Sequence, residues 1–415
     1  MGACPTLESA GAVGIIAAGP GLEYCGLALV DKAGPSRPGA GVPPKAAPLF
    51  CGGLASPPEA ALRLCGRHRR ADAAAVRLRA ELGSLCREAL PGEPTRGPVL
   101  GGGTWSTVYA GEWRGRCVAV KAFQSAFGER PEETEQRWQL LLREACLLRD
   151  LRSPRVVQLL GACVGTDGGP CLLLELATGG TLRRLLHGSA VGGGSPRRKG
   201  LWEAPLRPAQ RLLLASHVSE GVAYLHAQAP PIVHRDLKSQ NVVVVRRATD
   251  GQLKGAKLID FGLAEWAGRS DEAERKTEVS SSVFSRHALP EVRGSAGYMA
   301  PECLAEAPRG SSPSVGTPAD VWALGCVLVE TFGGAPPHTE CEDAAQVAAK
   351  VLSRREPPDV PAHVDLAAGG DVRDDTVRRL LRRCFIFEAA GRPRADDLLA
   401  ELRELATLRG LKLPS

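Results

Sequence analysis

A glycine-rich turn followed by a lysine on the next strand-like segment is the first feature of this sequence that could do chemistry. Residues 100–103 read LGGG, and residues 118–121 read VAVK. Side chains alternate along an extended strand, so Ala119 and Lys121 share one face of it. A small side chain beside a lysine suits a flat base next to phosphates, and backbone N–H groups of a glycine turn can close over those phosphates. Glycine-rich turns alone are common, so it is the combination with the lysine strand that indicates nucleotide binding.

A glutamate inside an apolar helical stripe is the second feature. Within the helical pattern of residues 132–151, Leu141, Glu144 and Leu148 fall at intervals of three and four residues and share one helical face. An unpaired buried charge costs on the order of several kcal/mol, so this carboxylate needs a partner. Lys121 is the natural candidate. The alternative is that Glu144 lies merely at the edge of the stripe.

Three further motifs follow in order along the chain. Residues 234–241 read HRDLKSQN, residues 260–262 read DFG, and residues 300–302 read APE. Together with the glycine turn and the lysine strand, this series resembles the signature motifs of eukaryotic protein kinases. One departure is that Ser106 stands where the loop of that family has its third glycine. We therefore expect altered loop behaviour and ATP affinity, with ATP binding retained.

The resemblance implies an α+β, two-lobed protein kinase fold, with a small antiparallel β-sheet lobe carrying one main helix and a large, mostly helical lobe. The expected strands are residues 108–110, 117–121, 156–164 and 171–176, the expected helix is 132–151, and helical patterns dominate after the Gly/Ser-rich stretch 188–200. The kinase domain is expected over residues 95–408. Residues 1–90 form an N-terminal extension that is rich in Gly, Ala and Pro and then becomes helical in pattern.

The resemblance also assigns chemical roles. The catalytic residues that it implies are Asp236, Lys238, Lys121 and Glu144, and the implied ligands of Mg²⁺ are Asn241 and Asp260. Asp236 is expected to orient the substrate hydroxyl and accept its proton, and Lys238 to neutralise the transferring group. Lys121 would hold the α- and β-phosphates of ATP. Carboxylate and amide oxygens suit Mg²⁺, which bridges phosphate oxygens.

An ATP pocket is implied in the same way. Its expected residues are Leu100, Gly101, Gly102, Gly103, Val108, Ala119, Lys121, Leu174, Glu175, Ala177 and Val243. Leu174 would be the gatekeeper, and the backbone of residues 175–177 would hydrogen-bond adenine. Val243 resembles the adenine floor, with Val108 and Ala119 as its roof. Without the resemblance, residues 171–177 would read equally well as a core strand followed by a turn.

Two residues of the second half are expected to be structural. Asp320 resembles the aspartate that opens the central helix of the large lobe and holds the backbone of the catalytic loop. Arg392 matches the arginine that pairs with the glutamate of the APE motif, here Glu302. A guanidinium fits a carboxylate bidentately, which suits a structural clamp.

Serine/threonine specificity is expected from two residues. Lys238 follows Asp236 by two positions, and the run that contains Ser295, GSAGYM, resembles the G-[S/T]-x-x-Y stretch of serine/threonine kinases. The Ser295 hydroxyl is expected to bridge Asp236 and Lys238. Residues 159–163, LLGAC, and the SQN ending of the catalytic loop resemble the tyrosine-kinase-like group, near Raf and mixed-lineage kinases. That group is mostly specific for serine and threonine.

Other functions are weighed against this one. A catalytically weak, pseudokinase-like scaffold would be marked by loss of Lys121, Asp236, Asn241 or Asp260, and all four are present. A kinase-fold enzyme that acts on a small molecule is disfavoured by the intact APE motif and the long segment before it. A dual-specificity kinase stays open. The predicted function is an ATP-dependent serine/threonine kinase of intracellular signalling that acts on protein substrates.

The segment between the DFG and APE motifs carries hydroxyl groups that could be phosphorylated. They are Thr277, Ser280, Ser281, Ser282 and Ser285. In kinases that this chain resembles, the arginine before the catalytic aspartate, here Arg235, helps bind a phosphate on this segment. We expect such a phosphate to order the loop through charge-assisted hydrogen bonds. The alternatives are a solvated insert and a permanent negative charge from Glu291.

Composition excludes several other classes. Apolar residues make up 44% and charged residues 24% of the 415, as in an ordinary globular protein with room for more than one domain. The formal net charge of +6 is spread over short clusters without a nucleic-acid fold signature, so no nucleic-acid partner is expected. The 13 cysteines lack C-x-x-C spacing, which favours reduced thiols over disulfides or a zinc site.

The first six residues fit the N-myristoylation pattern M-G-x-x-x-[ST], and Cys4 is available for palmitoylation. Residues 11–30 are fairly apolar, but Pro20 and Glu23 interrupt them, so no membrane span is expected there. A single myristoyl chain binds a membrane only marginally. The expected location is therefore cytoplasmic, with membrane contact only if Gly2 and Cys4 are both acylated.

Overall fold

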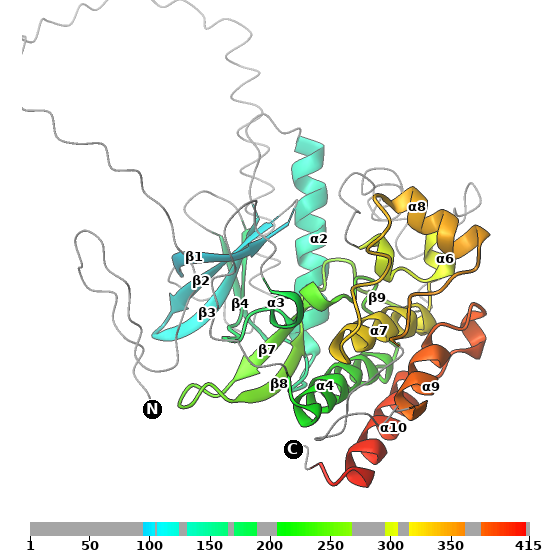
Figure 1. The fold of residues 1–415 in the computed structure, drawn as a ribbon. Coiled ribbons are helices and arrows are strands. Elements are labelled where there is room, and N and C mark those ends of the chain that lie inside the picture. The colour runs from blue at the N-terminus through cyan, green and yellow to red at the C-terminus, as the bar shows by residue number, and fades with distance from the viewer. Residues whose placement is uncertain are drawn as a thin grey trace, which may run out of the picture.

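The computed structural model describes residues 94–103, 106–123, 131–164, 170–188, 206–267, 295–305, 315–361 and 375–411, with the side chains of 131–140 excepted. These residues form a small lobe dominated by a β-sheet and a larger helical lobe (Figure 1). The predicted two-lobed α+β fold is confirmed. The N-terminal extension, the acylation pattern, the stretch 189–200 and the hydroxyl-rich residues 277–285 lie outside the described residues.

The small lobe is a five-stranded antiparallel sheet. Its strands are β1 (Thr95–Gly102), β2 (Ser106–Trp113), β3 (Arg116–Phe123), β4 (Leu159–Val164) and β5 (Pro170–Glu175), in the order β1-β2-β3-β5-β4. A two-residue turn joins β2 to β3, and in it Arg114 and Gly115 both have positive φ, of 54° and 72°. Two positive φ angles are the signature of a type I′ turn, whose twist matches that of the flanking strands.

The two faces of β3 are buried in different clusters. Val118 and Val120 pack with Leu173 of β5 on one face, whereas Ala119 belongs to the main core of the protein with Leu172. The alternation predicted for this strand is therefore confirmed. Lys121 lies on the Ala119 side, where the sheet meets the rest of the molecule.

Helix α2 (Pro131–Asp150) covers that side of the sheet and contacts β4 and β5. It begins with Pro131, a residue favoured at the first helical position because its missing N–H would have no partner there. Leu141, Ala145 and Leu148 are fully buried along its inner stripe. These three residues place Glu144, which lies between them, at the junction of the two lobes.

The large lobe is built from helices around one central helix, with two small two-stranded sheets beside them (Figure 1). In chain order its elements are α3 (Leu182–His187), α4 (Pro208–His226), β6 (Ile232–Val233), a 3₁₀ turn (Ser239–Asn241), β7 (Val242–Arg246), β8 (Leu253–Leu258), β9 (Glu265–Trp266), a 3₁₀ turn (Ala296–Tyr298), α6 (Pro301–Leu304), α7 (Thr317–Thr331), α8 (Ala344–Ala348), a π-helical turn (Ala349–Ser353), α9 (Asp375–Cys384), a 3₁₀ turn (Ala389–Gly391) and α10 (Ala395–Leu408). β6 pairs with β9, and β7 pairs with β8.

Helix α7 is the centre of this lobe. Every residue from Ala319 to Thr331 is buried, as expected of a helix that is apolar all round. Trp322 packs edge-on against Phe385 and Phe387, with ring centroids 5.2 and 5.5 Å apart. The helix ends before Gly333, whose φ of 100° is readily adopted only by glycine. None of the described helices has the length and apolar character needed to cross a membrane.

One predicted strand starts later than expected. β4 begins at Leu159, although the expected strand began at residue 156. Val156 forms a single parallel bridge to Leu258 of β8, and the N–H of Val157 donates to the carbonyl oxygen of Leu258 at 2.9 Å. The prediction was wrong at this end because these residues bond to the large lobe, a long-range pairing that a local pattern does not reveal.

Candidate active site

Lys121 lies at the centre of a cluster of three charged residues. Its Nζ donates to both carboxylate oxygens of Glu144, each at 2.8 Å, and to Oδ1 of Asp260 at 2.9 Å. Lys121 and Glu144 are buried, whereas the side chain of Asp260 is 45% exposed. The predicted ion pair between β3 and α2 is confirmed. The same ammonium also holds the first residue of the DFG motif, which joins the two lobes.

The charges of this cluster stabilise one another. Burial alone would lower the pKa of Lys121, but the carboxylates of Glu144 and Asp260 outweigh burial and raise it, so the ammonium stays charged. The Lys121 charge in turn lowers the pKa of Asp260 to about 2, although burial opposes this. Burial raises the pKa of Glu144, and Lys121 opposes that effect. Asp260 is therefore an anion at neutral pH with part of its carboxylate open to solvent.

Asp236 is held by two neighbours of the catalytic loop. Nζ of Lys238 donates to its two carboxylate oxygens at 2.9 and 2.7 Å, and Nδ2 of Asn241 donates to its Oδ2 and its carbonyl oxygen, both at 2.8 Å. Lys238 also donates to Oγ of Ser295 at 2.8 Å. Ser295 was expected to be the bridge, and this detail was wrong. Lys238 is the middle residue, because an ammonium has three protons and can serve both partners at once.

The backbone of the catalytic loop is fixed by Asp320 at the start of α7. Oδ2 of Asp320 accepts from the N–H of His234 at 2.7 Å, and Oδ1 accepts from the N–H of Arg235 at 2.9 Å. Arg235 has a φ of 65°, a conformation that non-glycine residues seldom adopt. The two hydrogen bonds stabilise this strained turn immediately before Asp236. The role predicted for Asp320 is thereby confirmed.

The DFG motif is held in place by contacts with the catalytic loop. The Phe261 side chain is fully buried and packs against the His234 ring, with centroids 4.9 Å apart. Nε2 of His234 lies 3.1 Å from the carbonyl oxygen of Ile259. The backbone of Phe261 also hydrogen-bonds to Glu144. Asp260 is therefore placed from both sides, by a lysine from the small lobe and by packing in the large lobe.

The residues expected around adenine come from both lobes. In the sheet, Ala119 lies opposite Leu174 of β5, and Val108 of β2 lies opposite Lys121. Val108, Ala119 and Leu174 all pack in or against the main core, next to one another on the inner face of the sheet. Val243 is on β7 of the large lobe, half-buried. The structure thus brings the two expected roof residues, Val108 and Ala119, next to the expected gatekeeper Leu174, and Val243 lies on the opposite lobe.

The segment after β5 connects the two lobes. The N–H of Glu175 donates to the carbonyl oxygen of Gln158 at 2.9 Å, and its carboxylate accepts from Nζ of Lys257 of β8 at 2.8 Å. Among the residues that the structure describes, the N–H of Ala177 has no hydrogen-bond partner. The expected hinge therefore offers a free backbone donor at the position where adenine is expected to bind.

The glycine turn leaves open space on its surface. The N–H of Gly103 donates to the carbonyl oxygen of Ser106 at 2.9 Å. A Cβ atom built on Gly101 or Gly103 would meet no other atom within 4 Å, and Leu100 is 41% exposed. The described part of the turn therefore leaves room beside the backbone of Gly101 and Gly103.

The donors available for a metal ion suit Mg²⁺. Asp260 offers an anionic carboxylate, and Asn241, whose Nδ2 already donates to Asp236, retains its Oδ1 oxygen as a ligand. Mg²⁺ is usually held by one or two protein oxygens together with substrate phosphates and waters. Within the described ranges, no group of three or more His, Cys, Asp or Glu side chains is placed to hold a metal ion. The pair fits an ion that arrives with a nucleotide.

Comparison with known proteins agrees with this geometry. The family model described as protein kinase domain matches residues 95–402. Mitogen-activated protein kinase kinase kinase 10 of Mus musculus is 30% identical over 320 residues, which are 76% of this chain and 28% of that protein. Serine/threonine-protein kinase CTR1 of Arabidopsis thaliana is 30% identical over 308 residues, or 74% of this chain and 31% of that protein.

This chain belongs to the protein kinase family. Mitogen-activated protein kinase kinase kinase 11 of Homo sapiens is a further relative, 32% identical over 244 residues. These relatives confirm that the kinase domain lies in the tyrosine-kinase-like group, near the mixed-lineage and Raf-like kinases. The chain matches less than a third of the length of each of these relatives.

A second buried glutamate supports the kinase domain's catalytic loop from below and was not predicted. Glu330, near the end of α7, accepts from the hydroxyl of Tyr298 at 2.6 Å and from Oγ of Ser239 at 2.9 Å. Nε2 of His187 lies 2.8 Å from the same carboxylate, and Nη1 of Arg183 lies 3.8 Å away. Burial, followed by the nearby Glu330 charge, raises the pKa of Tyr298. The tyrosine therefore remains a hydrogen-bond donor.

The sequence did carry a signal for Glu330. The run VLVET places this glutamate in a helix that is otherwise apolar, which is the same reasoning that led from Glu144 to a partner. Its partners could not be named in advance, because they come from α3, the catalytic loop and the segment before α6.

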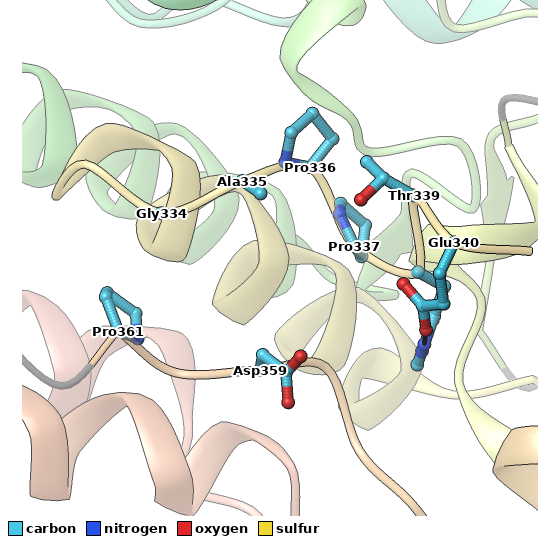
Figure 2. Close-up of a pocket in the computed structure, with 9 residues that line it drawn as sticks. Gly334, Ala335, Pro336, Pro337, Thr339, Glu340, Asp359 and Pro361 are labelled. Atoms are coloured by element: carbon cyan, nitrogen blue, oxygen red, sulfur yellow. Dashed lines mark ion pairs between the residues drawn. The ribbon is translucent and has the colours of Figure 1, made fainter.

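A small cavity of the kinase domain lies elsewhere. It is lined by residues 334–340, in the loop after α7, together with Asp359 and Pro361 (Figure 2). The His338 side chain is buried in its wall with Nδ1 3.8 Å from Oε1 of Glu340. None of the residues expected to bind nucleotide or metal lines this cavity, so it belongs to a different part of the surface from the candidate active site.

Proposed function

We propose that this kinase domain transfers the γ-phosphate of ATP, bound with Mg²⁺, to serine and threonine hydroxyls of protein substrates. The observation that carries the proposal is the position of Lys121, whose Nζ contacts Glu144 and Asp260 at once. This arrangement links the expected phosphate-binding strand to an expected metal ligand. Because phosphoryl transfer depends mainly on positioning and charge stabilisation, this arrangement of charges supports the proposal.

In this proposal the residues share the tasks of binding nucleotide, holding the metal ion and transferring phosphate. Lys121 contacts the phosphates of the nucleotide. The residues that surround the rest of it are Leu100, Gly101, Gly102, Gly103, Val108, Ala119, Leu174, Glu175, Ala177 and Val243. Asp260 and Asn241 would hold Mg²⁺, which supplies positive charge to the phosphate oxygens. Asp236, held by Lys238 and Asn241, orients the substrate hydroxyl and accepts its proton. Lys238 balances negative charge that develops on the transferring group.

The contact between Lys238 and Ser295 supports serine/threonine specificity. Ser295 precedes the 3₁₀ turn Ala296–Tyr298, and its Oγ accepts from Nζ of Lys238 at 2.8 Å. The contact connects the catalytic loop to the segment before α6. One of the relatives is named as a serine/threonine-protein kinase, and two others are named as kinases of a mitogen-activated protein kinase kinase. A mitogen-activated protein kinase kinase is accordingly the first protein substrate to test.

The test uses the purified full chain with Mg²⁺ and labelled ATP, and offers a recombinant mitogen-activated protein kinase kinase and a generic protein substrate in parallel. Phosphoamino-acid analysis should yield phosphoserine and phosphothreonine. Predominant phosphotyrosine would refute the specificity, and a dual-specificity enzyme would give all three. The Asp236→Asn variant is the matched control, since it should bind ATP and transfer no phosphate. A wild type that binds ATP without transferring it would support the scaffold alternative.

The remaining proposals concern location and magnesium. We place the protein in the cytoplasm, in contact with a membrane only if Gly2 and Cys4 are acylated. A labelled myristate analogue should then be incorporated at Gly2 in cells, and a Gly2→Ala variant should incorporate none. Chelation of divalent ions should stop phosphate transfer, and Mg²⁺ should restore it more fully than Ca²⁺, which prefers more and longer oxygen contacts.

A further inference from the structure

The side chain of Arg235, which precedes the expected catalytic base, is already paired with an acid from within the fold. Its Nη1 lies 2.6 Å from Oε2 of Glu265 on β9. Both side chains are about one-third exposed, at 35% and 34%. The register of the two short strands explains the contact, because Glu265 lies directly opposite Val233 of β6, two residues before Arg235. The ladder between β6 and β9 therefore brings the carboxylate to the arginine.

Glu265 is the one carboxylate within ion-pair distance of the Arg235 guanidinium in the part of the chain that the structure describes. The backbone of Arg235 has its own anchor, since its N–H donates to Asp320 at 2.9 Å. Backbone and side chain are thus held by two different acids. If Glu265 were neutral, a mobile guanidinium would lie one residue from Asp236 and could compete with Lys238 for its carboxylate.

The pair also joins two parts of the expected machinery. Arg235 belongs to the loop that carries Asp236 and Asn241, and Glu265 lies five residues after Asp260 in the strand that follows the DFG motif. An ion pair between them fixes the loop that would hold the substrate hydroxyl relative to the segment that would hold the metal. The attraction between two opposite charges at this distance favours one relative placement of the two segments that carry them.

We propose that Glu265 is a positioning residue that supplies the negative charge required by Arg235, so that the catalytic loop is ordered without a phosphate on residues 268–294. The inference rests on the proposed phosphate transfer and concerns how its machinery is assembled. The sequence suggested that a phosphate or Glu291 would provide this charge. The carboxylate of Glu265 provides it within the described fold. A phosphate that bound Arg235 would then have to share its guanidinium with Glu265 or displace it.

The experiment measures kcat and the KM for ATP in phosphatase-treated full-length protein. Treated wild type should keep its kcat, and the Glu265→Gln variant should lose about tenfold, because displacing a catalytic group by about 1 Å can cost up to about 100-fold. The KM for ATP should change little, since Glu265 is not among the expected nucleotide contacts. Glu265→Asp, which restores the charge on a shorter side chain, should recover part of the loss.

The matched control is Glu220→Gln. Glu220 forms a comparable ion pair, 3.0 Å from Nε of Arg155 and 29% exposed, on α4 away from the catalytic loop, and its loss should leave kcat unchanged. An exchanged pair, Arg235→Glu with Glu265→Arg, tests folding and should melt within a few degrees of wild type. If treated Glu265→Gln keeps the wild-type kcat, or if phosphatase treatment inactivates the wild type, the inference is wrong while the proposed function stands. If the untreated wild type transfers no phosphate, the proposed function itself fails and the inference falls with it.

Discussion

The guanidinium of Arg392 donates to both carboxylate oxygens of Glu302, from Nη1 at 2.6 Å and from Nη2 at 2.8 Å. The predicted clamp between the APE motif and the end of the domain is therefore confirmed. The Arg392 side chain is fully buried and also lies over the Trp322 ring, 5.2 Å from its centroid. The same guanidinium donates to the carbonyl oxygens of Ile386 and Pro318.

Replacing Arg392 should destabilise the large lobe. We expect Arg392→Ala to lower the free energy of unfolding by about 3 kcal/mol, the low end for breaking a buried pair, because Glu302 is 30% exposed. Arg392→Lys should recover only part of the loss, since an ammonium cannot form the bidentate contact. Urea unfolding followed by fluorescence measures both values. Equal stability of the lysine variant and wild type would show that the bidentate contact with Glu302 is unimportant.

Removing the central cation of the active site should affect catalysis more than folding. Lys121→Met leaves Glu144 and Asp260 as two carboxylates without their shared partner, and it removes the expected phosphate contact. We expect kcat/KM for ATP to fall by about 100-fold or more, as when a single oxyanion-stabilising donor is lost. Lys350→Met is the control, because Lys350 pairs with Glu340 on the surface and should leave the rate unchanged. An equal rate in the Lys121 variant would contradict the assignment.

The Glu330 network can be measured by a double-mutant cycle. Tyr298→Phe removes the donor of the 2.6 Å hydrogen bond, and Glu330→Gln removes the charge of its acceptor. Because both groups are buried and share one network, their effects on the free energy of unfolding should be non-additive, with a coupling of about 1–3 kcal/mol. Strict additivity would mean that Tyr298 and Glu330 stabilise the fold independently. A fall in kcat of Glu330→Gln would further show that this network affects the catalytic loop.

Acid stability should depend on His217. This residue of α4 is 4% exposed, its Nδ1 has no hydrogen-bond partner among the described residues, and burial followed by the Arg155 charge lowers its pKa to about 4. Between pH 6.5 and pH 4 the unfolded chain binds a proton that the folded protein does not, so stability falls as the pH is lowered through this window. Below about pH 4 the contribution is constant.

The size of this effect is at most about 3–4 kcal/mol, from about 1.4 kcal/mol for each unit by which the two pKa values differ. His217→Gln, which cannot take up the proton, should show a flatter fall of melting temperature from pH 6.5 to pH 4 than wild type. At pH 8 the histidine is neutral in both states, and that measurement gives the baseline cost of the substitution. Parallel pH profiles for the two proteins would contradict the shifted pKa.

The sequence predicted the fold and most of the contacts that depend on one element at a time. Glu144 could be assigned a partner because its helix has an apolar stripe and a carboxylate there must be neutralised. The register of β3 followed from simple alternation. Ser295 was placed near the right residues, but the order of donor and acceptors around Lys238 depends on side-chain reach, which spacing does not give.

The Arg235–Glu265 pair shows where such prediction stops. It depends on β6 and β9, strands of two residues each, which are too short for any periodicity to be recognised. The hydrogen bond from the N–H of Val157 to Leu258 of the large lobe was not predicted either. It belongs to a single bridge between distant segments, which leaves no periodic pattern in the sequence. Contacts of this kind are set by how completed elements pack, and only the folded chain reveals them.

Helix α7 carries both acids that hold the catalytic loop, Asp320 near its start and Glu330 near its end. At about 1.5 Å per residue, a rigid rod of about 15 Å separates these two anchor points. The loop therefore takes its dimensions from the helix beneath it. Inserting one residue into α7 would rotate one anchor by about 100° relative to the other, so that only one end of the loop could remain attached. The loop's amides that bond to Asp320 should also be among the last to exchange with deuterium, because they open only when α7, buried along nearly its whole length, comes apart.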